Sequence, residues 1–448
     1  MSFVSQDCAL SLLATILLLL LTSQSSCASK KTHTHVNSVD FLSQKFEVEP
    51  GHVANMFYYD IEFPKGHIGI KSVKAEIVDE AGKSIPLYEA YVHHYIITKY
   101  HQRKKVVQNT TALPNRWIFP HKDYVLKRNS GMCQKEVISH FFGLGSESRG
   151  TRTEIPDPYA IEVGNPKEIP QGFEEKWMIN IQIIDLRGVK DEKGCMDCRC
   201  NLYNVTHNEE GLPLPPTYKG GFLCCYHNTK CQLKEGFEGA KRSLHLKYTV
   251  KWVEWDHSVL PLEVYVFDVT DSVQVSSNGE KGPRFNHNCL VEYEIESCNN
   301  ITTHKDDDDD GCLHVKKTRI PFENDGYVIY GGAHLHFGGV NATLYGQDGR
   351  VICSSKPEYG TGEEVGNEKG FLVGMTTCYP NPGSVKVVDG ETLTLESVYV
   401  GNTSRTGLMN DFTLLDLDAI GCKSLQDKRG LFNLFLSTAR VTSGFLTG

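Results

Sequence analysis

The histidine pair at positions 334 and 336 is the strongest candidate for chemistry in this sequence. His334 and His336 lie within the segment YGGAHLHFGG. Residues two apart on a β-strand project from the same face, so both imidazoles can reach one metal ion. A methionine thioether as a further ligand would favour copper over zinc, and Met409 follows a predicted strand at 392–400. The ordinary alternatives are a surface histidine pair and a methionine that fills the core.

A second histidine pair, His93 and His94, lies in the segment YVHHYIITKYH. Adjacent residues of a regular strand point to opposite faces, so these two can share an ion only at a bulge or a strand end. Without such an irregularity, one histidine is buried and hydrogen-bonded while the other is exposed. His101, at the end of the same segment, lies too far along an extended chain to join them. The pair is therefore a candidate for a second metal site.

The elements that must position these side chains are predicted to be strands. Residues 244–252 alternate between apolar and polar side chains, which is typical of a strand with one exposed face. Residues 385–388 and 392–400 flank Asp389-Gly390, a turn sequence that predicts a β-hairpin. Glycine and proline recur along the chain, and no long amphipathic helix is evident. We therefore predict an all-β fold built from sandwiches.

Two domains fit the length and the composition of the segments. We expect an N-terminal β-sandwich at 36–271, a polar linker at 272–283, and a C-terminal β-sandwich at 284–422 that carries His334 and His336. Residues 423–448 are a tail to which the sequence assigns no structure.

The cysteines predict a disulfide-rich insertion at 191–241 in the first domain. The chain contains 15 cysteines, of which Cys8 and Cys27 precede the predicted mature protein. Six cysteines fall within the insertion: Cys195, Cys198, Cys200, Cys224, Cys225 and Cys231. Thiolate ligands of zinc are the alternative, but an oxidising compartment favours disulfides, with adjacent Cys224 and Cys225 paired to different partners. An odd cysteine remains, and Cys133 is the candidate.

The N-terminus and the glycosylation sequons predict a secreted, extracellular protein. An apolar run at 9–21, too short to span a bilayer, is followed by a polar stretch and by small residues, so residues 1–28 are predicted to be a cleaved signal peptide. An uncleaved anchor is the alternative, and no stable membrane span is expected after cleavage. The five acceptor sequons are at Asn109, Asn204, Asn300, Asn341 and Asn402.

Composition and motifs exclude several classes of function. The chain has 448 residues, is 40% hydrophobic and 23% charged, and carries a formal net charge of -9. This composition is globular, and its acidic balance offers no basic surface for nucleic acid. The sequence motifs of hydrolases and of nucleotide-binding proteins are missing. We expect no nucleic-acid partner, and a small-molecule or peptide ligand whose identity the sequence does not give.

The order His93-His94, a strand-rich stretch, His334-x-His336 and then Met409 resembles the copper type II, ascorbate-dependent monooxygenases. These are peptidylglycine α-hydroxylating monooxygenase and dopamine β-monooxygenase. The resemblance implies two tandem jelly-roll-like β-sandwiches. It also implies that His334, His336 and Met409 bind an oxygen-activating copper, while His93 and His94 are two of three ligands of an electron-donating copper.

One ligand expected from this resemblance is missing. The third histidine of the electron-donating site would fall in residues 177–187, where Ile184 occupies the expected position and cannot bind a metal. Neither His121 nor His140 lies in that strand. The first site is therefore expected to be degenerate, leaving one complete copper site.

A more extensive resemblance covers residues from about 36 to about 422. Motifs such as YVHHYIITKY, GLGSESRG and GGAHLHFGGVNATLYG resemble the plant stress up-regulated nodulin family, a group of secreted proteins. This resemblance implies a stress-related plant protein of the apoplast or cell wall. We predict a copper-binding, oxidoreductase-like protein with one copper ion; the alternative is a non-catalytic extracellular binding module with residual histidines.

Overall fold

The computed structural model describes residues 35–106, 123–126, 141–276, 284–286, 289–290, 292–295, 313–322, 324–401, 405–408 and 412–416. The described residues from 36 onward form one compact unit. The prediction of an all-β fold is confirmed, since strands dominate this unit and its only described helices are short. The jelly-roll connectivity and the two-domain boundaries stay predictions.

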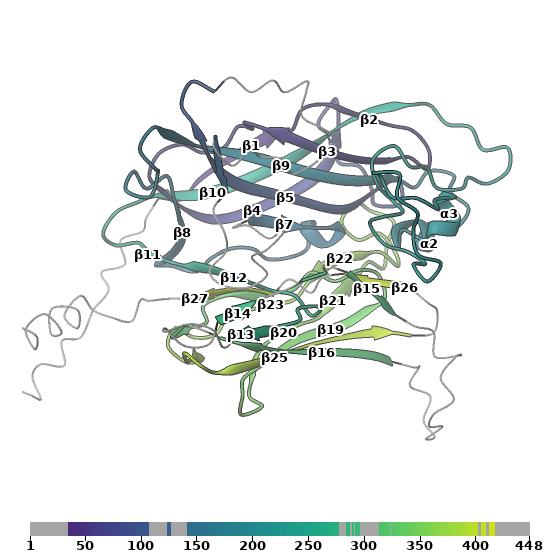
Figure 1. Cartoon of the computed structure of the whole chain (residues 1–448). Coiled ribbons are helices and arrows are strands. Elements are labelled where there is room, and N and C mark those ends of the chain that lie inside the picture. Colours follow the sequence, from purple (N-terminus) through teal and green to yellow (C-terminus); the bar gives the residue numbers. More distant parts are fainter. Residues whose placement is uncertain are drawn as a thin grey trace, which may run out of the picture. The chain divides into compact units, whose positions relative to one another are not determined.

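The strands of residues 36–261, here called the first half, form two sheets (Figure 1). The six-stranded sheet has the order β1-β10-β4-β8-β11, with β2 also paired to β10. Its strands are β1 (Asn37–Leu42), β2 (Phe46–Val48), β4 (Ile68–Asp79), β8 (Tyr159–Val163), β10 (Arg242–Glu254) and β11 (Leu260–Pro261). The five-stranded sheet has the order β3-β9-β5-β6, with β7 paired to β5. Its strands are β3 (Val53–Tyr59), β5 (Ala90–Arg103), β6 (Tyr124–Leu126), β7 (Phe141–Leu144) and β9 (Phe173–Asp185).

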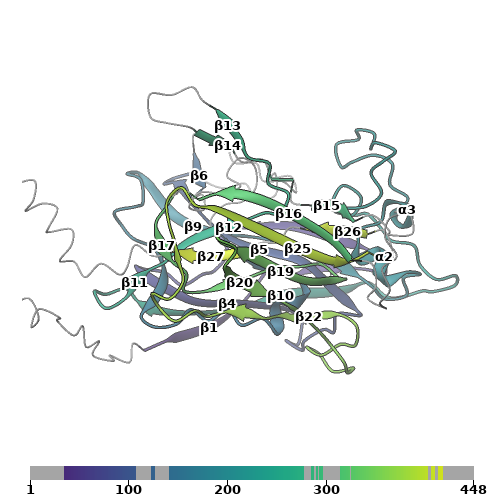
Figure 2. The same ribbon diagram turned by 90° about the horizontal axis from the view of Figure 1, so that it is seen from below.

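The described strands of residues 263–416, here called the second half, form two four-stranded sheets and four two-stranded sheets. One four-stranded sheet contains β16 (Leu313–Pro321), β25 (Thr392–Val400), β19 (Gly339–Tyr345) and β20 (Val351–Ser355), which Figure 2 labels. The other contains β12 (Glu263–Phe267), β27 (Phe412–Asp416), β18 (Gly331–Gly332) and β23 (Thr377–Cys378). The smaller pairs are β13 (Gln274–Ser276) with β14 (Arg284–Asn286), β15 (Glu292–Ile295) with β26 (Arg405–Leu408), β17 (Gly326–Tyr327) with β24 (Lys386–Val387), and β21 (Pro357–Tyr359) with β22 (Leu372–Met375).

The alternating segment at 244–252 lies within β10, as predicted. Its apolar residues from Leu244 to Val250 are buried, Trp252 is half-buried beside a register shift, and the intervening polar residues are partly exposed. This alternation packs one face of β10 against the core, and pairing with β1, β2 and β4 places the strand inside its sheet. The core of the first half also includes Tyr330 and Phe371 from the second half, so apolar packing continues across the two halves.

The predicted hairpin around Asp389-Gly390 is wrong. Gly390 does adopt a left-handed turn, with φ +81°. However, β24 pairs with β17, while β25 pairs with β16 and β19. The turn therefore sends its two flanking strands into different sheets, because their partners lie elsewhere in the sequence.

The described residues include only part of the predicted linker and two of the five predicted sequons. Residues 274–276 of the linker form β13, and β12, which precedes it, pairs with β27 of the second half. Asn204 is exposed and Asn341 is half-buried in β19; glycosylation stays a prediction at all five sequons. The other three sequons, the predicted signal peptide, Cys133 and residues 423–448 lie outside the described residues. No helix in the described part of the chain is long and apolar enough to cross a membrane.

The insertion at 191–241 is held by disulfides, as predicted. It contains α2 (Glu192–Met196), α3 (Cys200–Tyr203) and three bonds: Cys195–Cys231, Cys198–Cys225 and Cys200–Cys224. Adjacent Cys224 and Cys225 pair with different partners, also as predicted. A further bond, Cys353–Cys378, links β20 to β23 in the second half.

The insertion also contacts the second half through a partly buried carboxyl group. The Tyr218 hydroxyl donates a hydrogen bond to Glu292 of β15, and the Phe222 amide donates to Glu292 Oε2 at 2.8 Å. Burial raises the pKa of Glu292 to about 7, although both hydrogen bonds favour the charged form. The folded protein therefore retains a proton at this contact that the unfolded chain releases above its ordinary pKa.

This proton makes stability depend on pH. The contribution of Glu292 is fully present below about pH 4.5 and is lost as the pH rises through about 7. Glu292→Gln has no such proton. The wild-type protein should therefore lose free energy of unfolding on the order of 2 kcal/mol between these two pH values, and the variant should not. Urea unfolding between pH 4.5 and 8 measures the difference. Glu294→Gln, at an exposed position of the same strand, is the matched control; parallel pH profiles for all three proteins would contradict the assignment.

Candidate functional site

The four histidines singled out in the sequence lie together in the structure. We call His93, His94, His334 and His336 the histidine cluster. The ring centroids are 5.7 Å apart for His93 and His94, 4.7 Å for His93 and His336, and 5.5 Å for His334 and His336. The two pairs therefore form one continuous group, with His93 in contact with the second half of the chain.

A bulge in β5 explains how adjacent His93 and His94 approach each other. Opposite β9, Val92 pairs with Ile183 and His94 pairs with Gln182, so His93 is an extra residue in β5. An extra residue interrupts the strict alternation of side chains. The strand irregularity that His93 and His94 need in order to bind one ion together is thus present.

His334 and His336 do not lie in a strand, which differs from the prediction. β18 ends at Gly332 and β19 begins at Gly339, and the segment between them is irregular. The backbone amide of His336 donates a hydrogen bond to the Tyr399 hydroxyl at 3.0 Å. A side-chain partner thus replaces the missing strand pairing and fixes this backbone, which leaves both imidazoles in the cluster.

Glu147 connects the two halves at the cluster. It lies in the short 3-10 helix η1 (Ser146–Arg149) and is completely buried. Its Oε1 lies 2.5 Å from His334 Nδ1. The carboxylate accepts the Nδ1 proton, which leaves the lone pair of His334 on Nε2. Nothing in the spacing of the sequence had marked Glu147, because its partner lies 187 residues away.

Gly145 allows this approach. A Cβ at this position would lie 2.7 Å from the His93 carbonyl oxygen and 2.8 Å from His334 Cε1. Both distances are shorter than real Cβ contacts, so any larger residue would push the two histidine segments apart.

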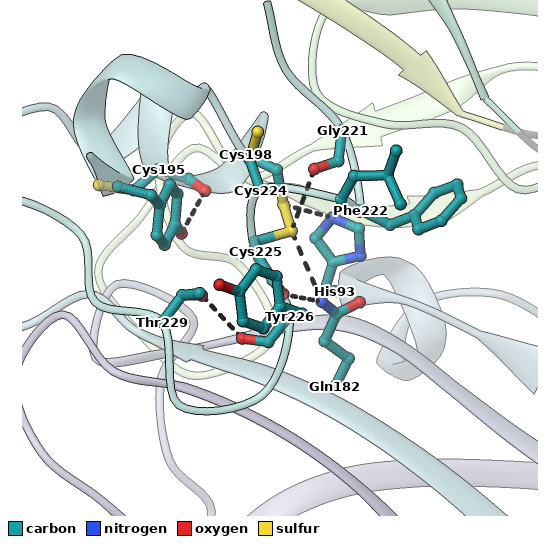
Figure 3. The surroundings of a disulfide bond; sticks show 12 residues. His93, Gln182, Cys195, Cys198, Gly221, Phe222, Cys224, Cys225, Tyr226 and Thr229 are labelled. Carbon is teal, nitrogen blue, oxygen red and sulfur yellow. Dashed lines mark hydrogen bonds between the residues drawn. A yellow bond between two sulfur atoms is a disulfide. The ribbon is translucent and has the colours of Figure 1, made fainter. Parts of the chain in front are cut away.

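The Cys198–Cys225 disulfide packs against His93 (Figure 3). His93 Nε2 lies 3.4 Å from Cys198 Sγ. A disulfide sulfur has no hydrogen to donate, so Nε2 carries the proton and the lone pair is on Nδ1. Gln182 of β9 lies beside the same disulfide and donates to the Cys225 carbonyl oxygen at 2.7 Å.

His94 is oriented by Asn180. The Asn180 amide group donates to Asn55 Oδ1 at 2.8 Å and to the Met56 carbonyl at 3.0 Å, so its oxygen faces His94. His94 Nε2 donates to that oxygen at 2.7 Å. The lone pair of His94 is therefore on Nδ1.

Two ring nitrogens in the cluster are buried without a hydrogen-bond partner. They are His93 Nδ1 and His336 Nε2, and each side chain is only 2% exposed. Buried polar atoms normally have a partner, so each such atom calls for an explanation. A metal ion would supply one for both nitrogens.

Burial keeps these imidazoles neutral. It lowers the pKa of His94 to about 4 and the pKa values of His93 and His336 well below the ordinary range, and repulsion between the histidines lowers them further. Neutral imidazole is the form that binds metals.

The side chains that β9 brings to the cluster are Asn180 and Gln182. Ile184, the residue expected at the missing ligand position, is completely buried in the core and pairs with Tyr91. Gln182 is the residue opposite His94, and its Oε1 is buried without a hydrogen-bond partner. The bulge at His93 shifts the register between β5 and β9. A ligand position counted along the sequence alone does not include this shift.

Of the other predicted residues, only His101 can be placed, and it does not join the cluster. Met409 lies outside the described residues, directly after β26. His101 is buried on β5 with its Nε2 3.8 Å from Glu175. Within the described residues, three potential ligand atoms lie within 4.8 Å of one another only at His93, Cys198 and Cys225, and the two sulfurs there are bonded to each other. A metal bound by all four histidines therefore requires rotation of their rings.

Comparisons with known proteins identify the family of the chain. Two solved structures similar to it are the VP2 subviral particle of infectious bursal disease virus and particles derived from infectious bursal virus. Each is 8% identical with a TM-score of 0.11; the matches cover 86% of this chain and 80% and 78% of those chains, respectively. No curated protein matches the chain. A family model, stress up-regulated Nod 19, matches residues 34–417. The chain therefore belongs to the stress up-regulated Nod 19 family.

Proposed function

We propose that this protein binds one copper ion at the histidine cluster, with ligands from both halves of the chain. The observation that supports this most strongly is the spacing of the rings, 4.7 to 5.7 Å between neighbouring centroids. Around one tetrahedral ion with metal–nitrogen distances of about 2.0 Å, imidazole centroids lie roughly 5 Å apart. The buried, unpartnered His93 Nδ1 and His336 Nε2 also fit a bound cation.

The neighbouring side chains leave a lone pair for a metal on three of the four histidines. Glu147, Asn180 and the Cys198–Cys225 disulfide each engage one ring nitrogen of a different histidine. Such partners fix the tautomer of a metal ligand and orient its ring. Imidazole sites bind copper(II) more tightly than the other divalent metals of the first row, and the resemblance to the copper monooxygenases supports the same choice.

Copper, when bound, would supply one-electron redox chemistry. Glu147 would hold the Nδ1 proton of His334, and the disulfide would exclude water from one side of His93. The monooxygenases that the sequence resembles draw one electron from each of two copper ions. A cluster that gathers both histidine pairs around one ion favours copper binding and redox exchange with an external reductant over their complete cycle.

We also propose that the protein is secreted and N-glycosylated, and that it acts in the plant stress response at the apoplast or cell wall. The described disulfides support an oxidising compartment. The family match supports the link to stress. A non-catalytic extracellular binding module is the alternative, and it would follow if the purified protein held no metal at the cluster.

Removal of either histidine pair should abolish the same copper. We expect His93→Ala and His336→Ala each to weaken copper affinity by more than the 10- to 100-fold that loss of an outer partner costs. The measurement is copper per chain by elemental analysis after dialysis against a competing chelator. His101→Ala, which removes a buried histidine of the same strand outside the cluster, should retain the ion. Retention of half the copper by each cluster variant would indicate two separate sites and contradict a shared one.

Glu147 should act as a positioning residue for His334. Glu147→Gln keeps the size of the side chain but removes the charge that strengthens the ligand, so we expect copper affinity to fall about 10- to 100-fold. Chelator competition measures the affinity, and thermal unfolding of the metal-free protein measures stability. Glu368→Gln is the matched control: Glu368 is equally buried and contacts Arg149 and the Leu87 amide, but no histidine. Equal losses of affinity in the two variants would show that Glu147 only stabilises the fold.

A further inference from the structure

We infer that the cavity bordered by His334 binds a small, largely apolar molecule that carries one hydrogen-bond acceptor. The cavity has a volume of about 70 Å³ and receives side chains from both halves of the chain. This inference rests on the proposed copper site, to which it adds the class of molecule that approaches the ion.

Apolar side chains form most of the cavity wall. They include Ile70 of β4, Leu144 of β7, Ile161 of β8, Val264 of β12 and Ala333, which precedes His334. Leu144 directly precedes Gly145, the residue whose lack of a side chain lets His334 approach His93. The cavity and the histidine cluster therefore share one wall.

Most polar groups of the wall are already occupied by protein partners. The hydroxyls of Ser72 and Thr153 lie 2.7 Å apart, and the Tyr330 hydroxyl donates to the Arg152 carbonyl at 3.0 Å. The Thr151 hydroxyl donates to the Glu147 carbonyl at 2.8 Å. These groups can therefore contribute little to recognition of a ligand, which makes the cavity effectively apolar.

One hydroxyl in the wall is left to recognise a ligand. Tyr95 of β5 lines the cavity, and no hydrogen-bond partner for its hydroxyl is found in the described part of the chain. A phenol donates a hydrogen bond, so the matching group on the ligand is an acceptor such as a carbonyl oxygen. Small-molecule sites commonly combine an apolar wall with a few polar groups that fix orientation.

The size of the cavity limits the ligand. At about 70 Å³ the cavity is small compared with the pockets of several hundred Å³ that hold drug-sized molecules, so it fits only a small molecule. A short-chain ketone, or the end of a longer molecule that enters through an open side, has the required size and chemistry.

Butan-2-one is a suitable probe, observed by proton NMR with the full-length protein loaded with either copper(II) or zinc(II). Copper(II) is paramagnetic and zinc(II) is not, so a probe bound next to the cluster should relax faster with copper. Leu144→Phe fills the cavity and should weaken binding at least tenfold. Leu126→Phe changes a half-buried leucine of β6 outside the cavity wall and should leave binding unchanged.

Tyr95→Phe removes one oxygen atom and should weaken binding about 2- to 10-fold through the lost hydrogen bond. It also keeps the test valid if Leu144→Phe fails to fold. Equal binding by Leu144→Phe and Leu126→Phe, or unchanged binding by Tyr95→Phe, would overturn the inference. Equal relaxation with copper and zinc in a protein shown to hold copper would overturn the position beside the cluster. Loss of probe binding in Leu144→Phe together with no copper at the cluster would overturn the proposed function and support the cavity.

Discussion

The contact between Glu147 and His334 is the interaction on which the site depends. It joins a buried carboxylate of the first half to an imidazole of the second half, 187 residues later in the chain. A buried carboxylate without such a partner would be costly, so the two halves stabilise each other at this point. The same contact selects the tautomer of His334 and directs its free lone pair. The same contact thus packs the two halves together and prepares His334 as a metal ligand.

The chain around Glu147 is built to keep that contact in place. Gly150 donates a backbone hydrogen bond to Val373, and the Met375 amide donates to the Thr151 hydroxyl. Arg149 lies 3.3 Å from the buried Glu368. Two hydrogen bonds between the residues that follow η1 and β22 therefore fix one short segment at the boundary of the halves. The backbone of a site on such a boundary can be held in place without long helices, because strands and disulfides supply the rigidity, and only the rings must rotate to bind an ion.

The sequence predicted elements better than their pairing. The alternation at 244–252 identified β10 because a half-buried strand leaves a local pattern. Both histidine pairs were recognised from residue type and spacing, but their convergence depends on a bulge at His93 and on packing between the halves, which no local pattern encodes. The turn at Asp389-Gly390 was likewise local and present, yet the partners of its flanking strands were distant in sequence. Glu147 could not be predicted either, because its partner His334 is also distant in the sequence.

The central claim is that the two histidine pairs bind one ion together. X-ray absorption spectroscopy of the copper-loaded protein, combined with elemental analysis, tests it most directly because it counts imidazole ligands around the metal. The account predicts about one copper per chain with at least three imidazole ligands, more than either pair can supply. Two ions with two imidazoles each, or copper without imidazole ligation, would contradict it.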